Sequence, residues 1–420
     1  MNTEKKPVPL LRFPASQQNE EWENVKLGNC LLQTPDYGLN APAVPYSESL
    51  PTYLRITDIT DNGKFDKSHL ASVNAELTSE NSLQEGDIVV ARTGASVGKV
   101  YKYRKEDGLL IFAGFLIRLR PNPNKCNSEY LFQYMLSPSY KKWVNITSTR
   151  SGQPGINSTE YSSLPVPFPQ KLSEQQKIAE CLSSIDSYIS SINEKVEQLK
   201  THKKSLMQKL FPQKGQTVPE YRFSEYEKDK TWKEVKLGDV TTVINRRNKS
   251  NRSLPIYSIS NKDGFILQSE QFDGLDSESR GYDISLYKIV GRNTFAYNPA
   301  RINIGSIGYS GNLKEVLISS LYVCFKTTDE LDDEFLICFL KTAQFNQAVE
   351  NNVEGGIRSY LFYENFSRIK IALPSLQEQQ KIAAIILSID DVISKYTDKV
   401  SLLEDYKKGL MQQLFPTITK

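Results

Sequence analysis

The sequence predicts an α+β protein with two mixed globular units, each followed by a long helix, and the two helices paired as a coiled coil. Three observations lead to this prediction. A stretch at residues 172–212 recurs without a gap at 376–416. Each copy carries a seven-residue apolar repeat, which is typical of a helix that packs along a narrow seam. The segments before the two copies share a layout but little sequence, so the internal repeat defines the architecture.

The repeated stretch has the same two ends in both copies. Each begins with Glu-Gln-Gln-Lys-Ile and closes with Leu-Met-Gln-x-Leu-Phe-Pro. Ser173 with Gln176, and Ser375 with Glu378, have the spacing of a capping box. The closing proline ends each helix because it lacks the amide proton. Roughly 35 helical residues would extend over about 50 Å.

A lysine interrupts the apolar seam at the same place in each copy, at Lys203 and Lys407. One polar seam position in each helix can fix register and orientation, so the break favours pairing of the two copies with each other. The alternative is an ordinary amphipathic helix packed on its own domain. A strict narrow stripe over about five heptads is long for such a helix.

Composition indicates an ordinary globular chain. It has 420 residues, of which 39% are hydrophobic and 24% charged, and a length of this order suggests two to three domains. No apolar run approaches a membrane span, and the polar start of the chain does not resemble a signal peptide. Five scattered cysteines and two histidines argue against a disulfide framework or a zinc site, and a reducing cytoplasm is the expected compartment.

The pattern divides the chain into five segments. They are an N-terminal arm at 1–21, a first unit at 22–170, a first long helix at 171–212, a second unit at 213–374 and a second long helix at 375–420. Both units open with an Arg-Phe arm, then Trp22 or Trp232, then a short Val-Lys-Leu-Gly strand.

The first unit is expected to be mostly β from residue 53 to 120. An apolar strand at 87–92 runs into a Gly-rich turn at 93–98. A helix at about 128–144 and a loop at 149–155 follow, and a proline-rich extended segment leads into the long helix.

The second unit repeats this order with other residues. A basic cluster occupies 246–252, and 294–308 replaces the strand and its turn. A strand at 321–325, a helix at 333–349 and a loop at 355–360 follow.

Motifs for catalysis are incomplete. Gly94 to Lys99 is one residue short of a phosphate-binding loop, and Val100 stands where a hydroxyl is needed. Asn298-Pro299-Ala300 is half of the Asn-Pro-Pro-aromatic motif of amino-methyltransferases. With two histidines and no nucleophile elbow, the sequence nominates no general acid and base.

These residues resemble the shared regions of type I restriction-modification specificity subunits. The resemblance rests on the repeated helix, the Trp-x-x-Val-Lys-Leu-Gly segment, the strand at 86–94 and the Gly152-Gln153-Pro154 loop, and it covers nearly the whole chain. It implies a non-catalytic DNA-reading subunit with two target-recognition domains. Each domain would bind one half of a bipartite, asymmetric DNA target.

The resemblance also implies partners. The helices would form an antiparallel pair that sets the spacing and docks two adenine-methyltransferase subunits, which restriction-translocase subunits join for cleavage. S-adenosylmethionine, ATP and magnesium would belong to those partners, so no cofactor, metal or catalytic residue is expected in this chain. Two domains that read one face of duplex DNA must lie about one helical turn, ~34 Å, apart, which a rod of this length can enforce.

Candidate DNA-binding residues lie on the turns and loops that carry polar side chains. Arginine can grip guanine with two hydrogen bonds, and glutamine or asparagine can grip adenine. Lysine is expected on phosphates. The candidates of the first unit are Arg92, Thr93, Ser96, Lys99, Arg150, Ser151 and Gln153. Those of the second unit are Arg246, Arg247, Lys249, Arg252, Asn298, Arg301 and Arg358. Gly94, Gly98, Gly305 and Gly308 are interpreted as turn formers rather than contacts.

Two other classes of function stay open. A coiled-coil adaptor that does not bind DNA, with rods that dimerise between chains and heads that bind proteins, suits the net charge of only +3. A nuclease or methyltransferase that acts alone is less favoured, because no site for it is visible.

Overall fold

The computed structural model describes residues 8–16, 22–150, 152–213, 215–229, 231–354 and 360–416. The chain forms two compact units. The first comprises residues 1–194 and 397–420, and the second comprises residues 195–396. The division falls inside both long helices, so each helix contributes to both units. The five predicted segments follow the repeats in the sequence rather than compactness, and their boundaries stay predictions.

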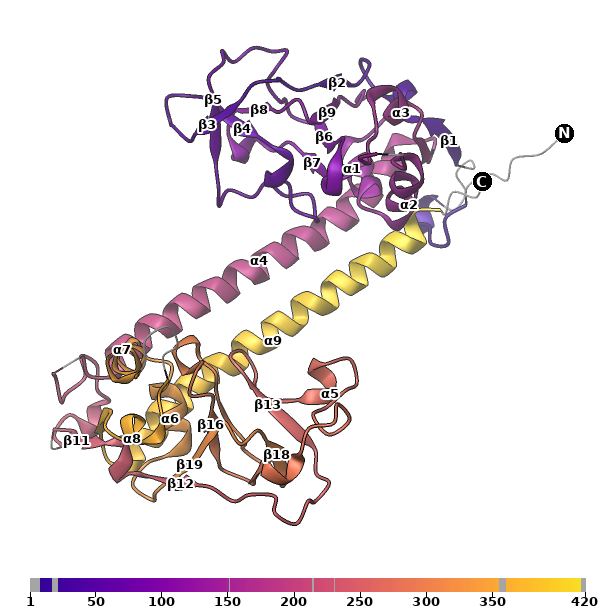
Figure 1. Ribbon diagram of the computed structural model, residues 1–420. Coiled ribbons are helices and arrows are strands. Elements are labelled where there is room, and N and C mark those ends of the chain that lie inside the picture. Colours follow the sequence, from indigo (N-terminus) through magenta and orange to yellow (C-terminus); the bar gives the residue numbers. More distant parts are fainter. Residues whose placement is uncertain are drawn as a thin grey trace. The chain divides into compact units, whose positions relative to one another are not determined.

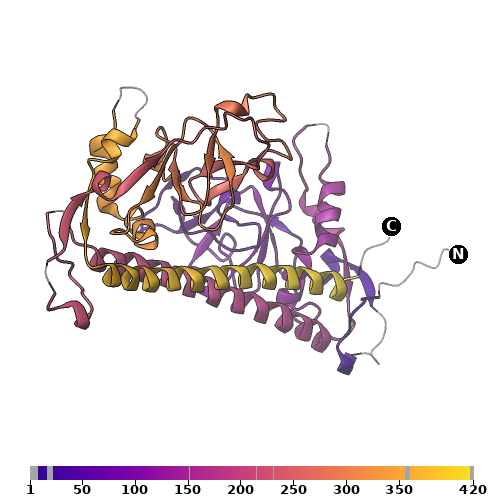
Figure 2. The same cartoon turned by 90° about the horizontal axis from the view of Figure 1, so that it is seen from below.

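The two long helices are α4, Leu172–Leu210, and α9, Leu376–Leu414, of 39 residues each. In the first unit, Asp186 and Tyr188 of α4 contact Lys407 and Lys399 of α9, so the residue numbers rise along one helix as they fall along the other. The helices are therefore antiparallel in this unit, where they run side by side (Figures 1 and 2).

The second unit pairs the helices in the same way. Lys195 and Lys203 of α4 contact Tyr396 and Asp390 of α9, again in opposite order. This confirms the predicted pairing of the two copies with each other.

The seam lysines form two equivalent ion pairs. Lys407 Nζ lies 2.7 Å from Asp186 Oδ2 in the first unit, and Lys203 Nζ lies 2.5 Å from Asp390 Oδ1 in the second. The lysine side chains are only 12% and 14% exposed. A largely buried cation is costly without a partner, so each ion pair favours one position of the lysine against the opposite helix.

The start of α4 differs from the sequence expectation. The helix begins at Leu172, so Ser173 lies inside it and is not its N-cap, and Gln176 donates to Glu180 one turn on. The expected capping box is therefore wrong there. The Glu-Gln-Gln motif is used differently, as described below.

The first unit contains two four-stranded sheets and one strand pair (Figure 1). The first sheet has the order β2-β9-β6-β7, with β2 Asp36–Tyr37, β9 Leu116–Leu119, β6 Ile88–Ala91 and β7 Val100–Lys102. The second has the order β3-β5-β4-β8, with β3 Ala43–Pro45, β5 Ala71–Val73, β4 Thr52–Leu54 and β8 Leu110–Phe112. The strand pair is β1, Glu23–Lys26, with β10, Pro165–Phe168.

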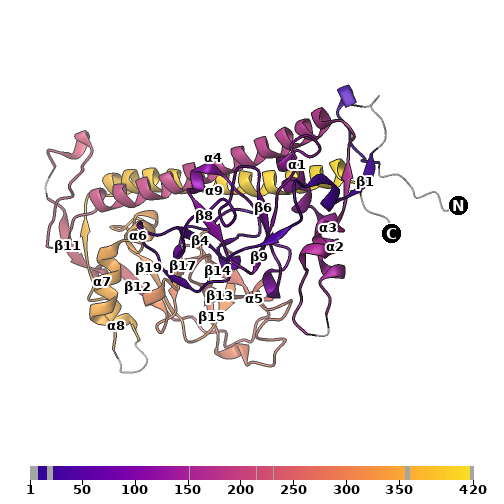
Figure 3. The same ribbon diagram turned by 90° about the horizontal axis from the view of Figure 1, so that it is seen from above.

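The helices of the first unit are α1 Ser128–Met135, α2 Pro138–Thr147 and α3 Ser158–Ser162. They gather beside β1 (Figure 3). The single helix expected at about 128–144 is therefore two helices. Ser137 adopts an extended backbone and caps Tyr140, and Pro138 has no amide proton to continue α1.

The second unit repeats the layout. Its sheets have the orders β12-β19-β16-β17 and β14-β13-β18-β15, beside the pair β11-β20. The strands are β11 Lys233–Lys236, β12 Thr241–Ile244, β13 Ile256–Ser260, β14 Gly264–Leu267, β15 Lys288–Val290, β16 Phe295–Tyr297, β17 Ile307–Tyr309, β18 Val316–Ile318, β19 Val323–Thr327 and β20 Lys370–Leu373. The helices are α5 Gln268–Gln271, α6 Asp333–Phe339, α7 Ala343–Asn352 and α8 Tyr363–Phe366. The helix expected at 333–349 is again two, because Thr342 caps a new helix at Phe345.

The residues that open both copies of the repeat fix the start of each long helix to its unit. At its start, Glu174 is 1% exposed and accepts from Arg12 Nε at 2.7 Å, and Glu378 accepts from Arg222 Nε at 2.9 Å. Both arginines come from the Arg-Phe arms. The neighbouring Gln175 accepts from the backbone of Asn127, which fastens α4 to the start of α1.

Each long helix starts in one unit and ends in the other. The phenylalanine that follows its last turn packs into the core of that second unit. Phe415 follows α9, and its ring centroid lies 5.4 Å from that of Tyr130 in the first unit. Phe211, after α4, lies 5.1 Å from Phe335 in the second unit. Each unit is therefore closed by the start of one long helix and the end of the other.

Candidate nucleic-acid interface

In the first unit, two of the predicted candidate segments meet at the end of β6. The Arg92 backbone donates to the carbonyl of Phe115 at 3.0 Å and accepts from the amide of Ile156 at 2.9 Å. Thr93 forms a β-bridge with Gly155, and Gly94 donates to the carbonyl of Pro154 at 3.0 Å. The strand end and the 149–155 loop, which are distant in sequence, therefore form one continuous surface.

Arg92 is held over an aromatic ring. Its guanidinium carbon lies 4.8 Å from the ring centroid of Tyr37, on β2, which is an attractive cation–π distance. The Tyr37 hydroxyl accepts from the amide of Ser158 at 3.2 Å. Hydrogen bonding to the Ser158 side chain is the main cause that lowers the pKa of Tyr37, and the Ser158 amide and the Arg92 charge add to it. The stack restricts the long Arg92 side chain before any ligand binds.

The other candidates of the first unit are arranged around this surface. Lys99 pairs with the exposed Asp61 at 2.8 Å, and Arg150 pairs with Glu160 and donates to the carbonyl of Thr147. Gln153 is exposed. Thr93 and Ser96 are half-buried in the turn, and Ser151 lies outside the described residues.

One glycine in each unit allows a close approach that a side chain would prevent. A Cβ on Gly98, whose φ is +84°, would lie 2.6 Å from Val144 Cγ1 of α2. In the second unit, a Cβ on Gly308 would lie 2.9 Å from Gly264 Cα. Neither approach leaves room for a side chain, which supports a structural role for these glycines.

The second unit builds the same junction from different residues. Asn298 follows β16 as Arg92 follows β6, and the next carbonyl, of Pro299, accepts from the amide of Leu361 at 3.0 Å. Asn298 itself is half-buried and donates its amide proton to Ser306. Arg301 is exposed in the adjacent turn, and Arg358 lies outside the described residues.

The basic cluster of the second unit leaves β12 at the end of the sheet where Asn298 leaves β16. The start of β19 lies between them, since Ile244 opposes Cys324 and Tyr297 opposes Val323. The cluster then pairs with the segment around β15, where Ile289 donates to the carbonyl of Arg246. Its cations therefore approach the same end of the sheet as Asn298.

Glu315 and Asn248 organise the cluster. Arg252 lies 2.7 Å from Glu315, and Arg246 pairs with the same carboxylate. Both lower the pKa of Glu315, Arg252 most. The buried Asn248 side chain accepts from the Arg252 amide and donates to its carbonyl. Arg247 and Lys249 are exposed on this frame.

Sequence reasoning missed several members of these surfaces. Tyr37, Phe115, Glu315 and Leu321 lie outside the basic and glycine-rich stretches. No local motif marks them. Their positions follow only from the strand pairing.

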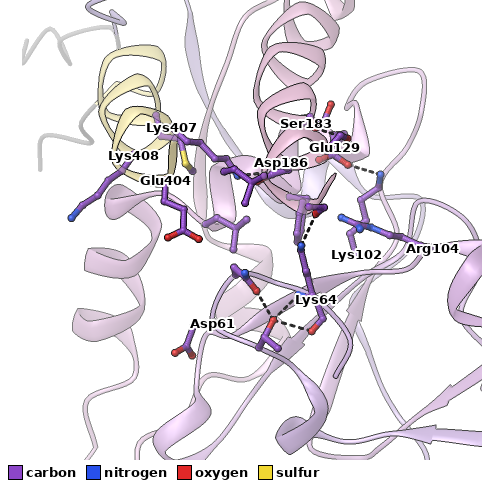
Figure 4. A pocket seen from close by; sticks show the side chains of 18 of the residues that line it. Asp61, Lys64, Lys102, Arg104, Glu129, Ser183, Asp186, Glu404, Lys407 and Lys408 are labelled. Atoms are coloured by element: carbon purple, nitrogen blue, oxygen red, sulfur yellow. Dashed lines mark hydrogen bonds and ion pairs between the residues drawn. The ribbon is translucent and has the colours of Figure 1, made fainter. Parts of the chain in front are cut away.

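A pocket of about 1760 Å³ in the first unit is a structural junction rather than a reading surface (Figure 4). It lies between the strands, α1, α2 and the two long helices. Two of its lysines are held by carboxylates, with Lys102 2.7 Å from Glu129 and Lys407 on Asp186. Gln133 donates to both carboxylates and so connects α1 with the helix seam.

Two kinds of feature are absent from the part of the chain that the structure describes. It shows no cluster of three histidine, cysteine or acidic side chains suited to a metal ion. It also shows no helix with the length and apolar composition needed to cross a membrane.

Comparison with known proteins decides the family. The family model described as "Type I restriction modification DNA specificity domain" matches residues 19–201 and 229–402. The chain belongs to this family. The earlier resemblance is thereby confirmed, and the chain is a DNA sequence-recognition subunit of the type I restriction-modification class.

Relatives cover this specificity subunit almost end to end. It is 27% identical over 406 residues to the putative type I restriction enzyme MjaX specificity subunit of Methanocaldococcus jannaschii, with 94% of this chain and 93% of the relative covered. It is 24% identical to the MjaVIII specificity subunit of the same organism, with 94% and 92% covered. The adaptor alternative is not favoured by these matches.

Solved structures agree on the fold. The type I restriction-modification S subunit from M. genitalium matches with a TM-score of 0.63 at 16% identity, covering 98% of this chain and 100% of that chain. A chain from a structural study of type I R-M complex assembly matches with a TM-score of 0.50 at 16% identity, covering 94% and 98%. The predicted α+β architecture with paired long helices is confirmed.

Proposed function

We propose that each unit reads one half of a bipartite, asymmetric duplex DNA target, and that α4 and α9 set the spacing between the halves. One observation carries the proposal. Two sheets of the same strand order place different polar side chains at the same end, with Arg92 and Gln153 in one unit and Asn298 and the Arg246 cluster in the other. A shared scaffold with different reading groups suits two different half-sites.

The side chains suggest a division of labour. Arg92 and Gln153 have the donors and acceptors to read guanine and adenine edges in the major groove, and Asn298 suits adenine. Lys99, Lys249 and the exposed arginines of the cluster suit phosphates, which position a protein without specifying sequence. The net charge of +3 is small, so we expect partners to supply part of the phosphate contact.

We further propose that the chain is non-catalytic and works with two adenine-methyltransferase subunits, and with restriction-translocase subunits for cleavage. Two helices with the same motifs at both ends offer two similar docking surfaces for two identical partners. S-adenosylmethionine, ATP and magnesium would be bound by those partners. The assembly is expected in the cytoplasm, the compartment that the cysteine usage suggests.

Mapping methylated adenines in the genome of cells that carry this chain and its methyltransferase partner tests the proposal. The expected result is one asymmetric motif with two defined blocks separated by a fixed spacer. A motif with two identical halves, or no motif at all, would contradict it. A gel-shift assay with sheared genomic DNA, with and without the methyltransferase, would show no retardation if the adaptor alternative were correct.

A further inference from the structure

Both units expose a large apolar side chain in the connection that leads into the equivalent sheet strand, one residue before that strand in the first unit and two residues before it in the second. Phe115 lies in the connection from β8 to β9, and Leu321 lies in the connection from β18 to β19. The residues are 58% and 76% exposed. The two connections are equivalent in strand order, although the units share little sequence. A single exposed apolar residue is ordinary, but the same placement in two divergent units asks for a common cause.

Both residues adjoin the proposed reading groups. The carbonyl of Phe115 accepts from the Arg92 amide, so the two residues are backbone neighbours across the sheet. In the second unit, Tyr297 opposes Val323, which places the chain just before β19 beside Asn298. Lys288 Nζ donates to the carbonyl of Tyr322 at 2.6 Å and holds that connection in place.

The second unit adds further apolar surface at this end. Ile304, in the turn after Asn298, is 57% exposed, and Phe362 is 53% exposed next to Leu361, whose amide binds the Pro299 carbonyl. Exposed apolar groups that surround polar reading groups are typical of a binding surface.

The major groove presents one apolar group among its hydrogen-bonding atoms, the C5-methyl group of thymine. A phenyl or isobutyl side chain beside an arginine or asparagine therefore matches a thymine next to a hydrogen-bonded base. We propose that Phe115 and Leu321 contact thymine methyl groups in the first and second half-sites, respectively. This inference rests on the proposed function and names two residues that determine specificity within it.

The test uses the full chain assembled with its methyltransferase partner and the mapped target duplex. Each thymine in turn is replaced by deoxyuridine, which removes only the methyl group. For wild type, the replacement at the contacted thymine of either half-site should weaken binding about fourfold, the effect of exposing one buried methyl. Phe115→Ala should abolish that dependence in the first half-site only, and Leu321→Ala in the second only.

Leu109→Ala is the matched control. Leu109 is 65% exposed but precedes β8, at the opposite end of that strand from Phe115. This variant should keep the full deoxyuridine dependence in both half-sites. Since all three side chains are exposed, circular dichroism melts should show all three variants folded like the wild type.

The outcomes separate the inference from the function on which it rests. If wild type does not prefer the mapped target over a scrambled duplex, the proposed function is overturned. If it does prefer the target, but Phe115→Ala keeps the wild-type dependence on the methyl groups, only the present inference is overturned. The same holds if Phe115→Ala weakens binding while no deoxyuridine replacement affects wild type, a result expected of a wedge between bases.

Discussion

At the scale of single residues, the two units prepare their cations differently. Arg92 stacks on the ring of Tyr37, whereas Arg246 and Arg252 share Glu315. A stacked arginine keeps its hydrogen-bond donors free for a base edge, since the ring face uses none of them. A paired arginine must exchange a carboxylate for its ligand. We therefore expect Arg92 to contribute more to sequence discrimination than either paired arginine.

Arg92→Lys tests this role. The charge is retained, but the planar fork and the stack on Tyr37 are lost. Binding to the target should weaken by about 1–3 kcal/mol, while binding to a scrambled duplex should change little. Fluorescence anisotropy at one fixed salt concentration measures both. An equal loss on the two duplexes would assign Arg92 to a phosphate or to folding.

Arg150→Ala addresses the loop that joins Arg92. Arg150 pairs with Glu160 at the start of α3, so it can position the loop as well as contact DNA. Binding should change with substitutions in the first half-site only. Glu160→Gln is the companion variant, because it loosens the loop but keeps the arginine. If both variants weaken binding to unrelated sequences alike, the loop has a purely structural role.

At the scale of elements, the motifs at the two ends of each long helix attach it to other elements of the unit. Glu174 fastens the start of α4 to the Arg12 arm, and Phe415 fastens the segment after α9 to Tyr130 of α1. Each joint has its counterpart in the second unit, at Glu378 and Phe211. The residues that the two copies share at their ends thus make equivalent contacts in the two units.

Lys407→Leu tests the seam ion pair. Asp186 is about one-third exposed and would keep Gln133 but lose its cation. The first unit should lose about 1–3 kcal/mol of unfolding free energy in denaturant melts. Combining it with Asp186→Leu should recover most of the loss, since two packed apolar groups can replace an ion pair.

Lys200→Leu provides the control for this measurement. Lys200 belongs to an exposed pair with Glu197 on the same helix face of α4, and such pairs contribute only about 0.3–0.5 kcal/mol. If Lys407→Leu lowers the unfolding free energy no more than Lys200→Leu does, the seam ion pair does not stabilise the helix pairing.

At the scale of the whole molecule, two units that share the strand order of one sheet but carry different reading groups are joined through two continuous helices. Because the helices have no break among their 39 residues each, their length is set by residue count alone. The proposed spacing between the half-sites can therefore be changed by changing the number of residues in both helices. We expect the seam to accept the removal or insertion of whole heptads, since these keep the apolar stripe in phase.

Removal of residues 192–198 together with 395–401, the opposite block on α9, should shorten the rod by about 10 Å. The methylated adenines of the two half-sites should then lie closer by about three base pairs, with both half-site sequences unchanged. Methylation mapping in cells gives the answer. A spacer of the original length would contradict the proposal that the helices set it. Removal of only one block should break the seam ion pairing and destabilise the protein.

Local sequence patterns predict much of the architecture. The heptad stripe, the matched lysines and the 204-residue offset between copies of the repeat predict two paired helices, because helical periodicity and repetition need no knowledge of distant contacts. The same is true of the strand at 87–92 and its glycine turn. Ser137-Pro138 is likewise a local signal, since serine caps a new helix and proline cannot continue the one before it, so the division of 128–144 into two helices is also encoded locally.

Tertiary structure alone decided which distant segments meet. The Leu-Phe-Pro ends are the same in both copies, so nothing in their sequence tells which core receives Phe211 and which Phe415. The stack of Arg92 on Tyr37 and the exposure of Phe115 and Leu321 likewise arise from strand order, which depends on long-range pairing. Periodicity and spacing report a residue's neighbours along the chain, whereas a recognition surface is made of neighbours across it.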